Sequence, residues 1–252
     1  MEQPDNVLKM LDPIAHMDAF VEEGVRYDGR LLASTREMTV ADAPGCKEGT
    51  SMGGVVVRLR PHCLPPKPRV ESVGGTSCTC HVSVQIGRPS LDQSNEGDLT
   101  FEVVLPAAAN PARYNTEQRK RHDDAVDLET LLHAVFCPGA GAPAVLDLTQ
   151  LCLQSGVAAY RLACTLHFTS VDGNLQDCAV AAAWHALHRT SLPRLVDNAN
   201  ADMAVPVLSR DGSVPLVLRK RVVATTYAVW LRQEQKEGSG VQVQSVGIWD
   251  RH

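Results

Sequence analysis

The chain has 252 residues, of which 44% are hydrophobic and 21% are charged, and its formal net charge at pH 7 is −5. A chain of this length and composition is predicted to be an ordinary globular protein that buries roughly 70–75% of its unfolded surface. The negative charge excludes a protein that coats nucleic acid with its whole surface, so any nucleic-acid contact must be local.

No stretch reaches the roughly 18–20 apolar residues that a membrane-spanning helix needs, and residues 1–10 do not have the charge pattern of a secretory signal. We therefore expect a soluble intracellular protein. The eight cysteines lie mainly in apolar stretches, which is typical of core thiols in a reducing compartment. Cys78 and Cys80 have no second Cys or His pair at a zinc spacing, so neither a metal nor a cofactor is predicted.

The first elements predicted along the chain are a helix over 13–23, turns over 24–30, and strands over 53–60 and 76–86. Apolar residues alternate in both strands, so each is expected to bury one face. Residues 61–75 contain four prolines and two glycines. This composition indicates a surface insertion between the two strands.

A helical pattern follows, with Thr116 as its predicted N-cap and an end before Pro138. Strict alternation then predicts a strand over 157–168. The alanine-rich stretch 175–189 is predicted to be a buried helix that packs between a sheet and a neighbouring helix and ends because of Pro193. Further strands are predicted over 214–219, 222–230 and 241–249. No internal repeat of 20–50 residues is evident, which excludes a solenoid.

Three segments, taken together, resemble the ribonuclease PH family, and in particular its exosome ring subunits. They are EGVRYDGR at 23–30, VDGNLQD at 171–177 with the alanine-rich stretch and Leu192-Pro193 behind it, and VATTYAV at 223–229. The resemblance covers about residues 20–250. It implies one α+β domain over 1–252 with the ribosomal protein S5 domain 2-like fold, in which mixed sheets pack against central helices.

The resemblance also implies a ring of six such domains with RNA threaded through a central channel. The implied partners are other ribonuclease PH-like exosome subunits, cap subunits with RNA-binding domains, and RNA. The implied locations are the nucleus, the nucleolus and the cytoplasm. Which ring position the chain occupies does not follow from the sequence.

Active members of the family follow the Asp-Gly turn with small hydroxyl residues and an arginine that grip phosphate. This sequence has Asn174-Leu175-Gln176-Asp177 there. The catalytic acids of active members follow the strand that 241–250 resembles, so their positions would lie past His252. Phosphorolysis without these groups loses the stabilisation of its transition-state charge.

The expected function is therefore that of a non-catalytic structural subunit that supports 3′-to-5′ RNA degradation by scaffolding partners and guiding RNA. The alternative is a phosphorolytic 3′-to-5′ exoribonuclease that is active only within a ring. A third possibility, an unrelated small-molecule enzyme on the same fold, would need a glycine-rich phosphate loop, and Gly238-Ser239-Gly240 is too short to serve.

The densest basic cluster, near the place where active relatives present arginines to phosphate and RNA, consists of Arg113, Arg119, Lys120, Arg121 and His122. Arg88 follows the predicted strand 76–86, where relatives place a loop that faces the channel. We take the four arginines and the lysine among these residues as candidate RNA contacts. The alternative for the cluster is a solvated helix start that is balanced by neighbouring aspartates.

Other polar residues have simpler interpretations. Asp172 and Asp177 could share a cation, but they are better explained as turn and helix-start residues. His185 and His188 are interpreted as packed or capping imidazoles. The run 219–221 (RKR) is interpreted as a solvated strand end or an interface charge, with RNA contact as the weaker alternative.

Overall fold

The computed structural model describes residues 11–26, 30–44, 53–60, 75–114, 118–138, 144–195, 208–234 and 242–248. The chain divides into two compact units. The smaller unit takes in Met1–Glu37, Pro61–Glu71 and Thr225–His252, and the larger unit takes in Met38–Arg60 and Ser72–Ala224. The expectation of one domain over the whole chain stays a prediction. Most of the predicted insertion at 61–75, and Thr116, lie outside the described residues.

The smaller unit contains helix α2 (Pro13–Glu22) and a two-stranded antiparallel sheet of β9 (Ala228–Glu234) and β10 (Gln242–Ile248). Helix α2 begins where the side chain of Asp12 accepts a hydrogen bond from the amide of Ala15 at 3.0 Å. The predicted helix and the last predicted strand are thus confirmed. The strand predicted over 222–230 begins only at Ala228, because the preceding residues make no strand pairing.

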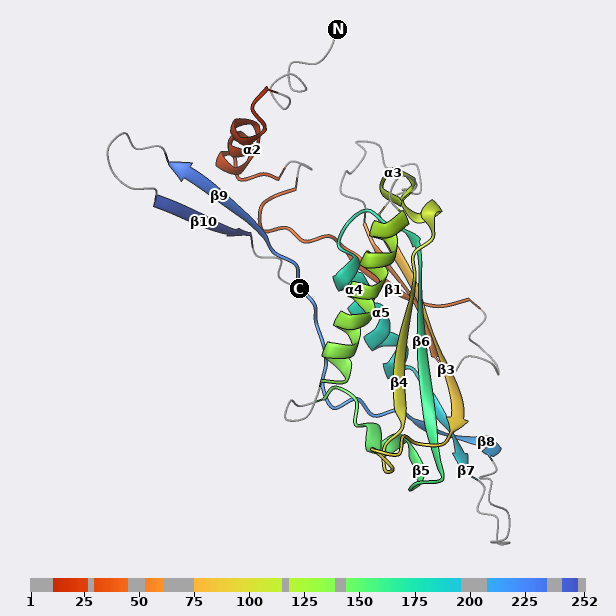
Figure 1. Ribbon diagram of the computed structural model, residues 1–252. Helices are drawn as coiled ribbons and strands as arrows, with labels where there is room; N and C mark the ends of the chain where they lie inside the picture. The colour runs from red at the N-terminus through yellow and green to blue at the C-terminus, as the bar shows by residue number, and fades with distance from the viewer. Residues whose placement is uncertain are drawn as a thin grey trace, which may run out of the picture. The chain divides into compact units, whose positions relative to one another are not determined.

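The larger unit is built on a six-stranded sheet (Figure 1). Its strands, in spatial order, are β1 (Met38–Asp42), β2 (Gly53–Leu59), β3 (Thr76–Gly87), β6 (Ala158–Ser170) and β4 (Asp98–Val104), and the short β5 (Cys152–Gln154) also pairs with β6. Strands β4 and β6 are parallel and the other pairs are antiparallel. A parallel pair needs a long crossover, and helix α4 (Gln118–Phe136) supplies it.

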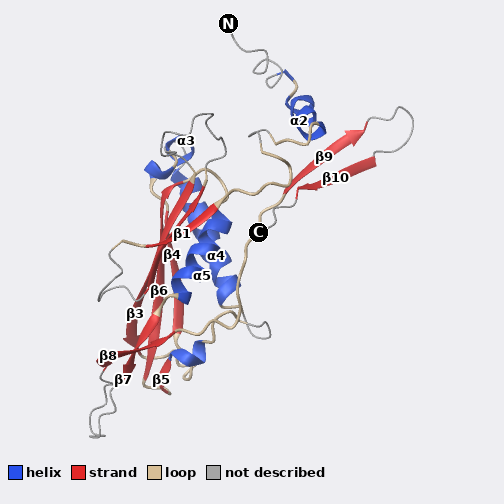
Figure 2. Cartoon of the chain, turned by 180° about the vertical axis from the view of Figure 1, so that it is seen from behind, coloured by secondary structure: helices blue, strands red, loops and turns tan. Residues whose placement is uncertain are grey.

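Helices α4 and α5 (Leu175–His188) pack together against one face of this sheet (Figures 1 and 2). Helix α5 lies over β2 and β3, and α4 lies over β4. The prediction of a buried helix between a sheet and a neighbouring helix is therefore confirmed. The small side chains of Ala179, Ala182 and Ala183, all fully buried, let the backbone of α5 approach the strands closely.

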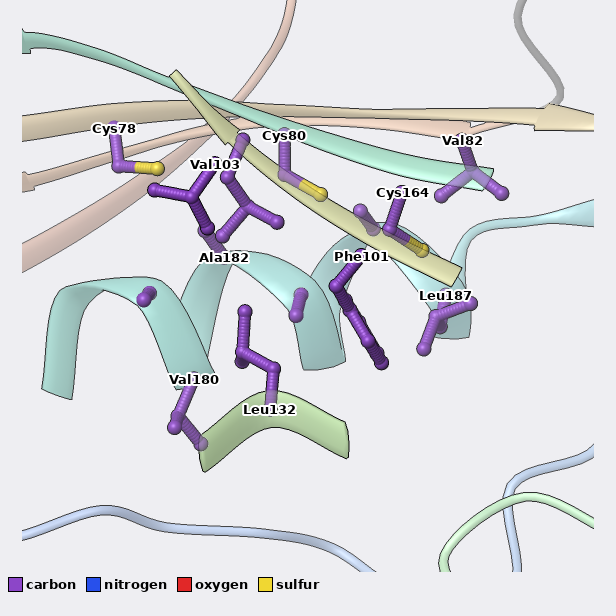
Figure 3. Packing of buried hydrophobic residues seen from close by; sticks show 14 of the residues in the cluster. Cys78, Cys80, Val82, Phe101, Val103, Leu132, Cys164, Val180, Ala182 and Leu187 are labelled. Carbon is purple, nitrogen blue, oxygen red and sulfur yellow. The ribbon is translucent and has the colours of Figure 1, made fainter. Parts of the chain in front are cut away.

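The core lies between the sheet and the two helices (Figure 3). Strand β3 contributes Cys78, Cys80 and Val82, and strands β4 and β6 contribute Phe101 and Cys164, all of them buried. The cysteines described by the structure are free thiols, and burial raises the pKa of Cys78 well above its usual value. The four buried thiols, Cys78, Cys80, Cys164 and Cys178, therefore act as small core side chains. Cys46 and Cys63 lie outside the described residues.

Two predictions from the sequence are wrong here, one about what ends α5 and one about the strand predicted over 214–219. Helix α5 ends at its C-cap Arg189, and Pro193 lies within strand β7 (Ser191–Leu195). Strand β7 pairs with β8 (Leu208–Pro215), and the register shifts beside Pro193. A proline is tolerated there because a short two-stranded edge has few ladder hydrogen bonds to lose. The strand predicted over 214–219 is also placed wrongly, because β8 runs over Leu208–Pro215.

Three short helical segments complete the larger unit. They are the 3₁₀ turns η1 (Ala107–Ala109) and η2 (Leu148–Leu151) and the four-residue helix α3 (Pro111–Tyr114). None of the helices in the described part of the chain is both long and apolar enough to span a bilayer.

Candidate functional site

The two ends of the central sheet differ in the side chains that they carry. The antiparallel pairing of β3 and β6 places Ser77 opposite Ser170 at one end and Gly87 opposite Ala159 at the other. Strand β6 has 13 residues, which at about 3.3 Å per residue separates these ends by roughly 40 Å. We call them the turn end, where β6 leads into α5, and the cleft end, where Arg88 follows β3 (Figure 1).

At the turn end, the predicted Asp-Gly turn joins β6 to α5. Gly173 has a φ of 73° and Asn174 a φ of 53°, so two successive residues adopt the left-handed conformation that this sharp reversal requires. The amide of Asp172 donates a hydrogen bond to the hydroxyl of Thr76 at 3.0 Å, and the Thr76 hydroxyl donates to the carbonyl of Gly173. The turn is therefore fixed to the start of β3.

The first turn of α5 contains a buried carboxylate. The side chain of Asp177 is 6% exposed, and the side-chain amide of Asn174 donates a hydrogen bond to it at 2.9 Å. A negative charge at this position interacts favourably with the free amides and the dipole at the helix start. The structure thus confirms the structural role predicted for Asp177. A bound phosphate at the same helix start would face this negative charge at close range.

The same end carries the basic cluster. The amide of Val171 donates to the carbonyl of Ala109 at 2.9 Å, and the side chain of Asn110 donates to the carbonyl of Val171 at 3.0 Å. These two bonds place η1 and α3 beside the Asp-Gly turn. Arg113 of α3 donates hydrogen bonds to both oxygens of Asp124, at 3.0 and 2.8 Å, and so connects α3 to α4.

Tyr114 shares this carboxylate. Its hydroxyl donates to Asp124 at 3.2 Å, and its side chain is fully buried. Burial, followed by the negative charge of Asp124 and this hydrogen bond, raises the pKa of Tyr114 to about 12, although the nearby Arg113 acts in the opposite direction. The phenol is therefore neutral at physiological pH, and Asp124 bridges two side chains of α3.

The remaining basic residues of the cluster lie in the first turns of α4. Arg119 lies 3.9 Å from the carboxylate of Asp123, and both side chains are mostly exposed. Lys120 is exposed and Arg121 is half-buried. The structure thus brings Arg113, Arg119, Lys120 and Arg121 to one end, as the sequence suggested, but it also brings two aspartates among them.

Arg88 lies apart from this cluster, at the cleft end. A cleft of about 290 Å³ opens there, and Arg88, Glu96, Asp98 and Arg161 are among the residues that line it. The guanidinium of Arg161 donates to the carbonyl of Arg88 at 2.8 Å. A Cβ at Gly87 would come within 2.8 Å of the Arg161 side chain, so a larger residue there would have to displace this guanidinium. Sequence reasoning did not select Arg161, although alternation along β6 places it on the exposed face.

The histidines of α5 and the basic run after β8 also meet. Trp184 stacks on His188 with ring centroids 5.0 Å apart and planes 18° apart, and its indole nitrogen donates to the carbonyl of Lys220 at 3.1 Å. Arg221 lies over the same indole ring. The interpretation of the two imidazoles as packed side chains is correct in so far as both contact Trp184. Sequence reasoning did not select Trp184 itself, because it lies in a stretch that is apolar on nearly all sides.

Within the described ranges, no group of three or more His, Cys, Asp or Glu side chains has a geometry that could hold a metal ion. Asp172 and Asp177 in particular do not belong to such a group. The candidate sites in the described residues are therefore groups of cationic side chains. They lie at three separate places: the start of α4, the cleft, and the end of α5.

Comparison with known proteins shows what the chain is similar to. Residues 70–193 match the family model described as RNase_PH, 3′ exoribonuclease family, domain 1. The chain is 26% identical over 212 residues to a protein of Methanopyrus kandleri named exosome complex component Rrp42, an alignment that covers 83% of this chain and 68% of that protein. It is 26% identical over 208 residues to the Bos taurus exosome complex component RRP45, covering 82% of this chain and 41% of that protein.

Two solved structures share the fold. An Archaeoglobus fulgidus exosome with RNA bound to the active site contains a chain that matches 92% of this chain and is matched over 75% of its own length, with a TM-score of 0.57 and 18% identity. A chain of an archaeal exosome core matches 98% of this chain and is matched over 89% of its own length, with a TM-score of 0.53 and 16% identity. The expected α+β fold, with a mixed sheet packed against central helices, is confirmed.

Proposed function

We propose that this chain, which carries a ribonuclease PH domain of the 3′ exoribonuclease family over residues 70–193, is a structural subunit of an exosome core ring. In this role it supports 3′-to-5′ RNA degradation and processing by holding partner subunits. The similarity to exosome components Rrp42 and RRP45 supports the assignment. The proposed partners are other ribonuclease PH-like subunits, cap subunits with RNA-binding domains, and RNA, and the proposed locations are the nucleus, the nucleolus and the cytoplasm.

The observation that carries the non-catalytic part of this proposal is the carboxylate of Asp177. The family resemblance places phosphate-gripping residues directly after the Asp-Gly turn, and here that segment presents Leu175, half-buried, and Asp177, buried in the first helical turn. A helix start can bind an anion only when its amides and dipole are free to face it. The negative charge of Asp177 opposes phosphate at that place, and phosphorolysis depends on bound phosphate.

Sheet edges support a role in assembly. Strands β1 and β4 each pair on one side only in the six-stranded sheet, so within the described residues their outer main-chain groups have no strand partner. Open edges of this kind are sites at which a neighbouring chain can add a strand or dock. We infer that ring neighbours cover at least one of them.

RNA guidance is the second part of the proposed role. Arg119, Lys120 and Arg121 at the turn end, and Arg88 at the cleft end, are the proposed contacts with the phosphate backbone. Arg113 belongs to the same set but contributes less, because Asp124 neutralises its charge. At the cleft end, Arg161 adds a second guanidinium beside Arg88.

Affinity purification of the tagged chain from its own cells tests the assignment. We expect ribonuclease PH-like proteins among the co-purified chains, identified by mass spectrometry, whereas a chain that purifies alone would contradict the proposal. The catalytic question is separate. The purified chain, given oligoadenylate and inorganic phosphate, is expected to release no ADP. Phosphate-dependent release of ADP by this chain would instead support an exoribonuclease.

A further inference from the structure

A mixed aromatic and basic surface lies where the last turn of α5 meets the segment after β8. We call it the Trp184 patch and define it by six residues: Trp184, His185, His188, Arg189, Lys220 and Arg221. All of them belong to the larger unit. The hydrogen bond from the Trp184 indole to the Lys220 carbonyl holds the two segments together across 36 residues of sequence.

The rings of the patch form an ordered stack. Trp184 packs partly against the hydrophobic core, and His188 stacks on it while remaining exposed. His185 meets the indole edge-on, with ring centroids 5.0 Å apart and planes 87° apart. The guanidinium carbon of Arg221 lies 5.8 Å from the centroid of the Trp184 ring. His188 thus presents one imidazole face to solvent and is supported from behind by an anchored indole.

The basic side chains of the patch are only partly neutralised. Arg189 pairs with Asp42 of β1, and the neighbouring Arg219 pairs with Asp147. Lys220 and Arg221 are exposed, and neither has a carboxylate partner among the described residues. Two cations therefore face solvent beside an aromatic stack in a protein whose net charge is −5.

An ordinary structural device explains part of this arrangement. Basic residues in the last turn of a helix interact favourably with its dipole, and His185, His188 and Arg189 lie at the end of α5. Lys220 and Arg221 come from another segment and are not explained in this way. Burial, followed by the positive charges of Arg189 and Arg221 and by His188, lowers the pKa of His185, which agrees with a local excess of positive charge.

We propose that the Trp184 patch is a binding site for single-stranded RNA. Lys220 and Arg221 contact backbone phosphates, and one base stacks on the exposed face of His188. Cationic side chains beside a supported aromatic ring can bind single strands without reading their sequence, because every base has a stacking face and every nucleotide a phosphate. The choice of RNA as ligand rests on the proposed function, whereas the site itself is separate from the candidate contacts Arg88, Arg113, Arg119, Lys120 and Arg121.

Fluorescence anisotropy with the full chain and a fluorescein-labelled oligouridylate tests the site. The double variant Lys220→Gln/Arg221→Gln is expected to bind about tenfold more weakly at 100 mM salt. The slope of log affinity against log salt should fall by about 1.4, since each phosphate contact on a single strand contributes about 0.7. The fold should be preserved, because the hydrogen bond from Trp184 goes to the main chain of Lys220 and the Arg221 side chain that is lost over the indole is exposed.

A matched control removes two exposed charges elsewhere. Arg58→Gln/Arg194→Gln has the same change in net charge, and both side chains are exposed in the larger unit. We expect it to bind RNA as the unaltered chain does. Equal losses in the two double variants would mean that net charge alone governs binding, and would overturn the proposal.

A second variant tests the stack independently. His188→Ala should weaken RNA binding by about five- to tenfold with an unchanged salt slope, because a stacking face is lost and no phosphate contact is. His167→Ala, an exposed histidine on the open face of the sheet, is the control and should have no effect. Unchanged affinity in His188→Ala, or displacement of the RNA by polyglutamate at equal charge concentration, would exclude base stacking and overturn the proposal.

Co-purification with ribonuclease PH-like proteins, measured on the same variants, separates this inference from the proposed function. If variants of the Trp184 patch co-purify with these proteins and also bind RNA normally, the proposed RNA site is contradicted and the proposed function is not. If these variants lose RNA affinity, but neither they nor the unaltered chain co-purify with such proteins, the proposed function is contradicted and the RNA site is not.

Discussion

The basic cluster at the start of α4 and the Trp184 patch contain similar numbers of cationic side chains but differ in what surrounds them. In the cluster, Arg113 bonds to both oxygens of Asp124, and Arg119 lies near Asp123. In the patch, Lys220 and Arg221 lie beside aromatic rings and have no described carboxylate partner. The density of basic residues along a sequence is therefore a poor guide to the charge that a surface presents, because neighbours in space decide how much of it is neutralised.

The strongest test of this comparison removes the central carboxylate of the cluster. We expect Asp124→Ala to lower the free energy of unfolding by about 2 kcal/mol, because Arg113 loses its partner and the buried hydroxyl of Tyr114 loses its acceptor. The midpoint of urea unfolding measures the effect. Asp123→Ala, in which only an exposed 3.9 Å pair is lost, should change it by at most about 0.5 kcal/mol.

RNA binding by Asp124→Ala gives a second test of how far Asp124 neutralises the cluster. With Asp124 gone, the cluster should become more like the patch, so RNA affinity should rise. If Asp124→Ala and Asp123→Ala had equal effects on both stability and RNA affinity, the two aspartates would be equivalent and the proposed neutralisation of Arg113 would be wrong.

A smaller effect is expected from the carboxylate at the start of α5. Asp177→Asn removes the charge from the first helical turn and should lower the free energy of unfolding by about 1 kcal/mol. Asp127→Asn, an exposed residue within α4, serves as the control and should be nearly neutral. Thermal unfolding with and without inorganic phosphate gives the second readout. Phosphate should stabilise Asp177→Asn more than the unaltered chain, and equal stabilisation would speak against the proposed repulsion.

The alkaline titration of Tyr114 tests the electrostatics of the cluster. Because its pKa in the folded chain is about 12 and its ordinary value is 10.0, folding favours the neutral phenol. The stability from this group is complete below pH 10 and is lost as the pH rises towards 12. Ultraviolet absorbance of the phenolate should reveal a late step that is missing in Tyr114→Phe. In Asp124→Ala this step should shift to lower pH, and its persistence near pH 12 would exclude Asp124 as a cause.

The smallest expected effect concerns the exposed residues of the cluster. Arg119→Gln/Lys120→Gln should weaken RNA binding only about two- to threefold, because Asp123 and Asp124 already offset part of the positive charge there. Anisotropy titrations identical to those for the patch provide the measurement. A loss of affinity as large as that of Lys220→Gln/Arg221→Gln would contradict the view that the cluster contributes less to RNA binding than the Trp184 patch.

The inner strands of the central sheet could be predicted from the sequence, whereas its edge strand β1 and the separate strand β7 could not. Strands β3 and β6 could be predicted because one buried face imposes alternation along most of their length, and β2 because its apolar residues are buried almost throughout. Strand β1 could not be predicted, because it is a half-exposed edge strand with no buried residue. Strand β7 was obscured by Pro193, a residue that usually argues against a strand.

The candidate sites follow the same division. The turn at Asp172 and the role of Asp177 could be predicted because both depend on local backbone geometry. The Trp184 patch could not, because its ring stack depends on a segment 36 residues further along the chain. Arg88 was placed correctly after β3, but its neighbour Arg161 lies 73 residues away in sequence and becomes visible only through strand pairing.

The position of β6 between β3 and β4 has a consequence for how the chain folds during synthesis. Strand β3 pairs with β2, which precedes it in the chain, but its other edge must wait for β6: Cys80, for example, pairs with Leu166, 86 residues later. At a synthesis rate of roughly 5–20 residues per second, β3 remains an open edge for about 4–17 s on the ribosome. Its apolar face has no helix to cover it in that interval either, since α5 follows β6. The nascent chain is therefore most prone to aggregation just before β6 is synthesised.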